Sequence, residues 1–184
     1  MLFTDTVDLY MVNSRSDANG SNGFSFDCCA GVYFGSCTAY NNVAAGWLIQ
    51  KVATGVIANT SQYFHMVSCI GDTNGSHNWV INDTIQSEFT NCWASTQNNA
   101  TADLHGIAVN GGCSYLEFNH CMALTNNGAG LIALSPATFI KITGGTWLAN
   151  GKVAASTQRY GISCSASSMQ INGAQCTDNQ GTKT

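Results

Sequence analysis

The sequence predicts an all-β fold, a single-stranded right-handed parallel β-helix (β-solenoid) of about seven coils. Three observations predict it. Apolar residues alternate in short segments that recur along the whole chain, a side-chain amide recurs at a fixed distance after each segment, and only 9% of the residues are charged. Short strands that repeat in this way can bury their apolar faces by stacking on one another along an axis.

One position in each repeat serves as its anchor. Four anchors are Cys residues, and each of these follows a Phe or a Met by three positions. Successive anchors are 23, 32, 23, 29, 24 and 29 residues apart, which fits a coil of about 23 residues with insertions. The seven anchors are Ser14, Cys37, Cys69, Cys92, Cys121, Gly145 and Ala174.

Each coil contains two predicted strands, because apolar residues alternate at two places in the repeat. The residues five and three positions before the anchor are apolar, with Ser87 as the exception: Leu9/Met11, Val32/Phe34, Phe64/Met66, Ser87/Phe89, Leu116/Phe118, Ile140/Ile142 and Met169/Ile171. A second strand starts about nine residues after the anchor, with the inward pairs Phe24/Phe26, Trp47/Ile49, Trp79/Ile81, Ile107/Val109, Leu131/Ala133 and Ile162/Cys164.

A polar amide follows each anchor by five residues, and we call this column the amide ladder. Asn suits a bend there because it tolerates left-handed backbone angles, and its amide can bond the amide one rung away, about 4.8 Å off. The four Cys anchors are expected to point inward as free thiols. The amide ladder contains Asn19, Asn42, Asn74, Gln97, Asn126, Asn150 and Asn179.

The chain is expected to form one β-helix domain over residues 1–184, with residues 1–7 as a lead-in and residues 8–184 as coils. Neither end carries the cap that a solenoid needs, so the domain is expected to be a segment of a larger chain or assembly. The N-terminus lacks the basic and apolar regions of a signal peptide, and no apolar run is long enough for membrane insertion.

Composition and spacing also limit the partners. The net charge of −4 leaves no basic surface for a phosphate backbone, so nucleic acid is not an expected partner. Nine Cys, mostly at inward positions, predict free thiols and folding in a reducing cytoplasm. No Cys-x-x-Cys pair is present to nucleate a zinc site, and we expect no metal and no other cofactor.

The repeat resembles the pectate-lyase-like superfamily of right-handed parallel β-helices over nearly the whole chain. Bacteriophage tailspike proteins are the most similar members, since they too have few charges and no disulfides. This resemblance implies binding of a bacterial surface polysaccharide, a homotrimer, and a place on the virion (phage tail) after folding in the bacterial cytoplasm. It leaves open whether the protein is an enzyme that depolymerises the polysaccharide, as a glycoside hydrolase or a polysaccharide lyase.

Two alternatives remain. One is a non-catalytic structural or adhesion β-helix of a trimeric fibre, whose ladders serve only assembly and receptor display. The other is an extracellular, secreted microbial polysaccharide lyase, which the missing signal peptide and the free Cys residues disfavour. No catalytic motif of the superfamily is present to assign residue by residue.

The candidate site is the outward column four residues before each anchor: Tyr10, Tyr33, His65, Glu88, Glu117, Lys141 and Gln170. Glu88 and Glu117 are the candidate catalytic residues, because adjacent rungs place them about 5 Å apart, near the carboxyl separation of retaining glycosidases. Tyr33, His65 and Lys141 are candidate substrate-binding residues. The alternative is a solvated face whose charges compensate along the ladder.

Insertions and one apolar stripe complete the predictions. Residues 98–104 and 151–160 are insertions after the amide ladder, and we expect both to leave the same edge and to wall a groove. Asp83 and Asp103 are further candidates for substrate binding. Ile70, Trp93 and Met122 fall one residue after their anchors and face outward, which favours a subunit contact.

Overall fold

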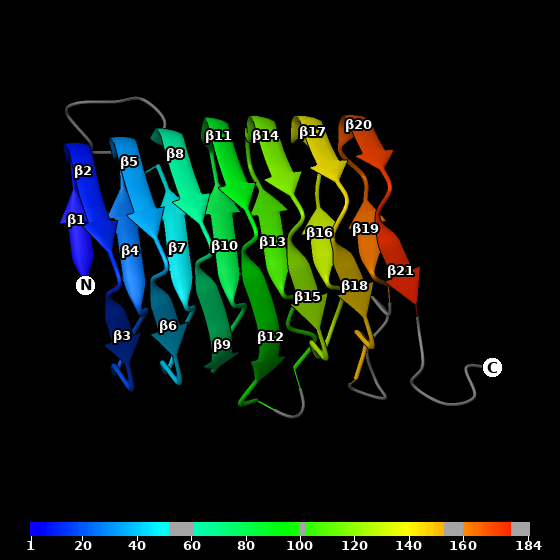
Figure 1. The fold of residues 1–184 in the computed structure, drawn as a ribbon, viewed down its shortest axis with the longest axis horizontal. Helices are drawn as coiled ribbons and strands as arrows, with labels where there is room; N and C mark the ends of the chain where they lie inside the picture. The colour runs from blue at the N-terminus through cyan, green and yellow to red at the C-terminus, as the bar shows by residue number, and fades with distance from the viewer. Residues whose placement is uncertain (52–60, 100–101, 153–159, 178–184) are drawn as a thin grey trace.

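The computed structural model describes residues 1–51, 61–99, 102–152 and 160–177, and these form three parallel sheets of seven strands each (Figure 1). Every strand pairs in parallel with its counterpart in the next coil. This is a parallel β-helix of seven coils, so the predicted fold class is confirmed. The described residues contain no helix with the length and apolar character of a membrane span.

Each coil runs through the three sheets in turn, and the coils follow one another along the axis from the N-terminal to the C-terminal end (Figure 1). Sheet A contains β1 (Leu2–Thr4), β4 (Phe24–Asp27), β7 (Trp47–Gln50), β10 (Trp79–Asn82), β13 (Ile107–Asn110), β16 (Leu131–Ala133) and β19 (Ile162–Cys164). Sheet B contains β2 (Val7–Val12), β5 (Ala30–Gly35), β8 (Ser61–Val67), β11 (Thr84–Thr90), β14 (Ser114–Asn119), β17 (Thr138–Thr143) and β20 (Ser167–Asn172). Sheet C contains β3 (Arg15–Asp17), β6 (Thr38–Tyr40), β9 (Ile70–Asn74), β12 (Trp93–Gln97), β15 (Met122–Leu124), β18 (Thr146–Leu148) and β21 (Gln175–Thr177).

Sheets A and B are built from the two strands per coil that the sequence predicts, and sheet C is built from a third strand in each coil. The strands of sheet C are mostly three residues long and begin directly after each anchor, so they show too little alternation to predict a strand. The structure also extends the repeat into the predicted lead-in, because β1 pairs with β4 between Leu2 and Thr4.

The core is a set of columns of identical or similar side chains. Phe24, Trp47 and Trp79 stack face to face, with centroids 4.4 and 4.8 Å apart. The two indole N–H groups donate to the backbone carbonyls of Ile70 and Trp93, so burial leaves neither unsatisfied. Trp47, Trp79 and Trp147 are fully buried, which confirms the inward positions predicted for Trp47 and Trp79.

The amide ladder stacks at one bend, between sheets C and A. Nδ2 of Asn19 donates to Oδ1 of Asn42 at 2.7 Å, and Asn42 donates in the same way to Asn74 at 2.9 Å. Farther along, Gln97 donates to Asn126 at 2.7 Å and Asn126 to Asn150 at 2.8 Å. The predicted register is confirmed for these six residues. The seventh, Asn179, lies outside the described residues.

The prediction that Asn occupies the ladder because it tolerates left-handed backbone angles is wrong. The left-handed residue of this bend lies one position before each amide, where φ is positive at Ala18, Asn41, Thr73, Thr96, Thr125 and Ala149. A left-handed residue other than Gly costs roughly 1–2 kcal/mol. The amides are therefore selected for hydrogen bonding and not for φ: besides its neighbour, each buried Asn of the ladder bonds a backbone carbonyl, as Asn126 does with Ala94 at 3.1 Å.

The four Cys anchors point inward as buried free thiols, as predicted. Their thiols donate to carbonyl oxygens of the preceding coil, for example from Cys121 to Phe89 at 3.1 Å. Burial raises the pKa of the Cys92 thiol well above its usual value. Cys164 and Cys176 are exposed because they lie in the last described coil, which has no described coil stacked beyond it.

Candidate functional site

The outer face of sheet B carries the predicted column in the predicted register. Glu88 pairs with His65 on β8 and with Glu117 on β14. Glu117 pairs in turn with Lys141 on β17, and His65 pairs with Tyr33 on β5. Paired residues of neighbouring strands lie one rung apart, about 4.8 Å. The structure therefore brings Tyr33, His65, Glu88, Glu117 and Lys141 together on one face.

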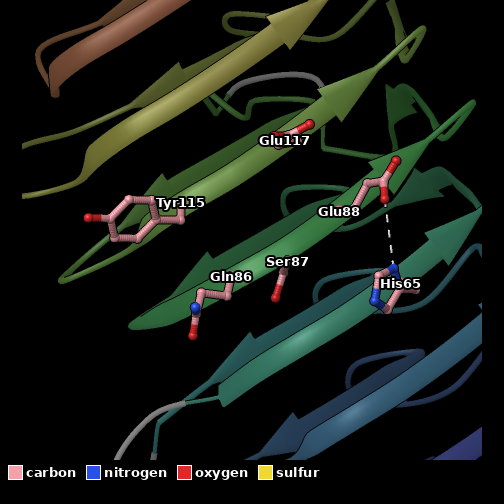
Figure 2. Close-up of a pocket in the computed structure, with 6 residues that line it drawn as sticks. All are labelled: His65, Gln86, Ser87, Glu88, Tyr115 and Glu117. Atoms are coloured by element: carbon pink, nitrogen blue, oxygen red, sulfur yellow. Dashed lines mark ion pairs between the residues drawn. The ribbon is translucent and has the colours of Figure 1, made fainter.

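Glu88 is held by hydrogen bonds from its own coil and the next. Its Oε1 accepts from the Thr90 hydroxyl at 2.8 Å and from the Asn119 amide at 2.9 Å. Its Oε2 lies 3.8 Å from Nδ1 of His65, and the dashed line in Figure 2 marks this pair. The bonds from Thr90 and Asn119, and to a smaller extent the charges of His65 and Lys141, lower the pKa of Glu88 against the opposing effect of burial. Glu88 is thus a carboxylate at neutral pH.

Glu117 has one oxygen engaged by the protein. Its Oε2 lies 3.2 Å from Nζ of Lys141, while the described residues offer no hydrogen bond to Oε1. Both side chains are partly exposed, so solvent screens this ion pair and it contributes at most about 1 kcal/mol to stability. The Oε1 atom is free to accept a hydrogen bond from a ligand.

A second outward column lies beside the first, and sequence reasoning missed it. Near the start of each strand of sheet B one residue has positive φ: Asp8, Gly31, Tyr63, Gln86, Tyr115, Phe139 and Ser168. In β11 this places two consecutive residues, Ile85 and Gln86, on the outside between buried Thr84 and Ser87. The strand therefore departs from strict alternation, as at a β-bulge. The sequence does contain a signal for this column. Inward residues recur eight and five positions before the anchor, and this spacing of three does not fit the two-residue alternation of a regular strand.

Aromatic rings line part of this second column. Tyr115 and Phe139 stack face to face with centroids 4.8 Å apart and an interplanar angle of 4°, although the two residues are 57% and 49% exposed. Tyr63, two coils before Tyr115, is also exposed. Near the N-terminal end of the same face, Tyr10 and Tyr33 form a similar stack at 4.8 Å. Exposed stacked rings offer an apolar surface to a ligand.

Two adjoining pockets lie over these columns. The first, of about 310 Å³, is lined by His65, Gln86, Ser87, Glu88, Tyr115 and Glu117 (Figure 2). The second, of about 230 Å³, is lined by Tyr115, Glu117, Phe139, Ile140, Lys141, Ser168 and Gln170. Because Tyr115 and Glu117 line both, the pockets form one shallow groove across the strands of sheet B, along the solenoid axis. We call it the sheet B groove.

The predicted acidic side chains Asp83 and Asp103 do not line this groove. Asp83 ends the turn between β10 and β11, and its Oδ1 accepts from the backbone N–H of Gly112 at 2.7 Å. Asp103 lies near the stacked imidazoles of His77 and His105, on the connection between sheets C and A. Both carboxylates are thus placed away from Glu88 and Glu117.

The two insertions also lie away from the groove. Residues 98–104 connect β12 to β13, and residues 151–160 connect β18 to β19, so both join sheet C to sheet A at one edge, as predicted. Sheet B lies between the other two edges, so these connections do not leave from either side of the sheet B groove, and the predicted groove wall is wrong for the described ends of both insertions. Residues 100–101 and 153–159 lie outside the described residues.

The predicted apolar stripe lies on sheet C. Trp93 pairs with Ile70 on one side and with Met122 on the other, and all three face outward with partial exposure. The neighbouring outward pair Leu124 and Leu148 extends the apolar surface. Sheet C is a different face from the groove, so both could be occupied at once.

No metal centre is evident in the parts of the chain that the structure describes, where no three His, Cys, Asp or Glu side chains gather closely enough to hold an ion. The His77 and His105 rings stack 5.1 Å apart and are bonded to backbone N–H groups: His77 Nδ1 accepts from His105 at 2.8 Å, and His105 Nδ1 from Ala129 at 2.9 Å. These contacts identify a structural pair.

Comparisons with known proteins give one likeness to report. No protein-family model and no curated protein matches the chain. Among solved structures, the crystal structure of a mutant of the periplasmic alginate epimerase AlgG aligns with a TM-score of 0.39 and 10% sequence identity. The alignment covers 91% of this chain and 50% of that protein, so this chain spans about half of its length.

Proposed function

We propose that this chain is a polysaccharide-binding β-helix of the bacteriophage tailspike type, which binds a bacterial surface polysaccharide in the sheet B groove. One observation carries the proposal: the exposed Tyr115 and Phe139 stack lies in the same groove as Glu88, Glu117 and Lys141. A sugar ring requires two kinds of group, aromatic rings for its C–H groups and polar groups for its hydroxyls. The groove offers both, as exposed aromatic rings beside ionic and amide groups.

The chemistry of the groove matches a sugar on both of its faces. The exposed apolar rings of Tyr115 and Phe139 offer a surface for packing against the C–H face of a pyranose. The free Oε1 of Glu117 and the ammonium of Lys141 supply an acceptor and a donor for hydroxyl groups. Because the groove crosses the strands, its groups repeat every rung of about 4.8 Å, close to the length of one sugar unit in an extended polymer.

Cleavage of the polysaccharide is the second candidate, and the pairing of Glu88 with Glu117 on adjacent rungs favours it. In a retaining glycosidase one carboxylate attacks the sugar and the other acts as acid and base. Glu88 suits the nucleophile because its lowered pKa keeps it ionised. Glu117 would then be the acid and base, a role that requires its carboxyl group to hold a proton beside Lys141.

The proposed biological setting is a homotrimer on the phage tail, folded in the bacterial cytoplasm. The Ile70, Trp93 and Met122 stripe of sheet C supports a subunit contact that leaves sheet B open. A non-catalytic fibre and an extracellular lyase remain the rival proposals. A fibre would leave the groove without a ligand, whereas a lyase would produce unsaturated sugar ends that absorb ultraviolet light.

An array of bacterial surface polysaccharides tests the proposal. The wild-type chain should bind at least one of them, and Tyr115→Ala should weaken that binding by about tenfold or more, because it removes the stack with Phe139. Val43→Ser is the matched control, since Val43 is an exposed apolar residue on a bend outside sheet B. Equal binding by the wild type and Tyr115→Ala would place the binding surface elsewhere.

A further inference from the structure

The charges of the sheet B groove limit the kind of polysaccharide that it can take, given the function proposed above. Two carboxylates, Glu88 and Glu117, line the groove, against one cation, Lys141. That cation lies 3.2 Å from Glu117, so these two charges offset each other and the carboxylate of Glu88 leaves the groove with a net negative charge. Among the residues that the structure describes, the other Lys and Arg side chains, Arg15, Lys51 and Lys152, line neither pocket.

The hydrogen-bonding groups of the carboxylates also favour an uncharged sugar over an acidic one. A carboxylate oxygen only accepts hydrogen bonds, so Oε1 of Glu117 requires a donor such as a sugar hydroxyl. Oε1 of Glu88 is occupied by Thr90 and Asn119, which keeps that carboxylate charged and fixed in place. An acidic sugar would instead present a second carboxylate to these fixed negative groups.

The aromatic platform has no charge preference of its own that would offset this bias. Tyr115 and Phe139 each turn one ring face toward the other in their stack, and neither ring carries a formal positive charge that could attract an anion. His65 becomes cationic only when protonated, and it then lies next to Glu88 at 3.8 Å. At neutral pH the bias of the groove against an anionic ligand therefore comes from its two carboxylates, and Lys141 is the cation that opposes it.

From these contacts we infer that the sheet B groove binds an uncharged glycan and rejects polymers of uronic acids. A polyuronate carries one carboxylate per sugar, so an extended chain along the axis would bring its charges to the rungs of Glu88 and Glu117. Like charges at this spacing repel each other, with an expected loss of affinity on the order of tenfold. The bound sugars contribute hydroxyl donors to the carboxylates and C–H faces to the rings.

The experiment compares acidic polysaccharides with their own carboxyl-reduced forms. Each acidic polymer on the array of bacterial polysaccharides is immobilised both natively and after reduction of its carboxyl groups to alcohols, which changes the charge and keeps the linkages. Binding should be confined to neutral and reduced polymers, with the reduced forms bound about tenfold or more above their native partners. Affinity for the neutral binders should not change with salt, because no ligand charge is screened.

A charge variant sharpens the result. In Glu88→Gln/Glu117→Gln the two groups lose their charge at nearly constant shape, so the preference for reduced over native polymers should shrink toward one. Equal or tighter binding of the native acidic polymers by the wild type would overturn the inference and leave the proposed function standing. Absence of binding to any polymer on the array would overturn both.

Discussion

Nδ2 of Asn78 donates to Oδ1 of Asn126 at 3.2 Å, across 48 residues of sequence and inside the amide ladder. In the other coils a Gly occupies the position of Asn78. The side chain of an Asn in the next coil fills the space beside this Gly: Asn74 lies against Gly46, and Asn126 lies against Gly106. One coil on from Asn78, the ladder residue is the longer Gln97. The Asn78 amide takes the ladder position instead, accepting from Asn74 at 2.8 Å.

This relationship predicts a rescue. Asn78→Ala removes one of the two acceptors of the buried Asn74 amide and leaves the carbonyl of Ala39 as the other, so the free energy of unfolding should fall by about 1–3 kcal/mol in urea denaturation. Asn78→Gly/Gln97→Asn rebuilds the Gly and Asn pair of the other coils and should recover most of that loss. Asn98→Ala, at an exposed amide, is the control. A double variant no more stable than Asn78→Ala would show that the two positions are independent.

Acid should destabilise the fold through His105. Burial lowers the pKa of His105 to about 4, with a smaller effect of the neighbouring His77, while Asp103 opposes the shift. The unfolded chain therefore binds this proton first, and stability should fall by about 3 kcal/mol as the pH drops from about 6.5 to about 4, then level off. Above about pH 7.5 His105 is neutral in both states and contributes no slope.

The measurement is urea denaturation at a series of pH values for the wild type and His105→Asn. Subtracting the two curves removes the carboxylates that titrate in the same range. The wild type should lose more stability than His105→Asn between pH 6.5 and 4, whereas His65→Gln, at an exposed imidazole, should behave like the wild type. Parallel curves for the wild type and His105→Asn would show that His105 is not the group responsible.

The thiols should divide into two classes by reactivity. The thiolate is the reactive form, and both burial and a raised pKa suppress it at Cys92 and at Cys113, whose pKa is raised to about 11. Only Cys164 and Cys176 are exposed. Ellman's reagent should therefore modify two thiols quickly in the native protein and all nine in denaturant. Fast native reaction of more than two would contradict the inward placement of the Cys column.

The assembly proposal predicts a trimer that depends on Trp93. Placing a charge there opposes burial of the stripe, so Trp93→Lys should sediment as a smaller species than the wild type, with the same β-sheet signal in circular dichroism. Val43→Lys adds the same charge on a bend outside sheet C and should leave the assembly intact. A wild-type chain that sediments as a stable monomer would count against the trimer.

If the protein cleaves its polysaccharide, Glu117→Gln should abolish cleavage while binding stays nearly unchanged, because the shape is kept and the proton chemistry is lost. The products of the wild type should retain the anomeric configuration if the two carboxyl groups lie about 5 Å apart, which proton NMR of the fresh products measures. Cleavage by Glu117→Gln at the wild-type rate would place the catalytic site elsewhere.

The fold could be predicted from the sequence because every column repeats one kind of residue in coil after coil. The register of Glu88 with Glu117 and the stacking of Asn126 on Asn150 both follow from counting residues from the anchors. The third sheet was missed because strands of three residues hold too few alternations. Turns are the other part of the fold that the periodicity does not predict. Asp83 lies in a turn, and its side chain bonds the backbone of the next coil.

The site was predicted only in part, for a similar reason. Counting residues from the anchors placed His65 and Lys141 beside the carboxylates. Tyr115 could not be placed in this way, because its own left-handed backbone conformation shifts the strand out of alternation. The bonds from Thr90 and Asn119 to Glu88 depend on side-chain rotamers, which a sequence pattern does not contain.

The left-handed corners give this architecture a natural unit of evolutionary change. At the corner between sheets B and C, for example, each coil carries its own positive-φ residue, from Asn13 in the first to Gly173 in the last. Each coil is thus a self-contained module that meets both neighbours in the same way. Duplication of a segment of about 23 residues would lengthen the molecule by one step of about 4.8 Å without remodelling the rest, so the reach of its outer faces could grow or shrink in whole increments.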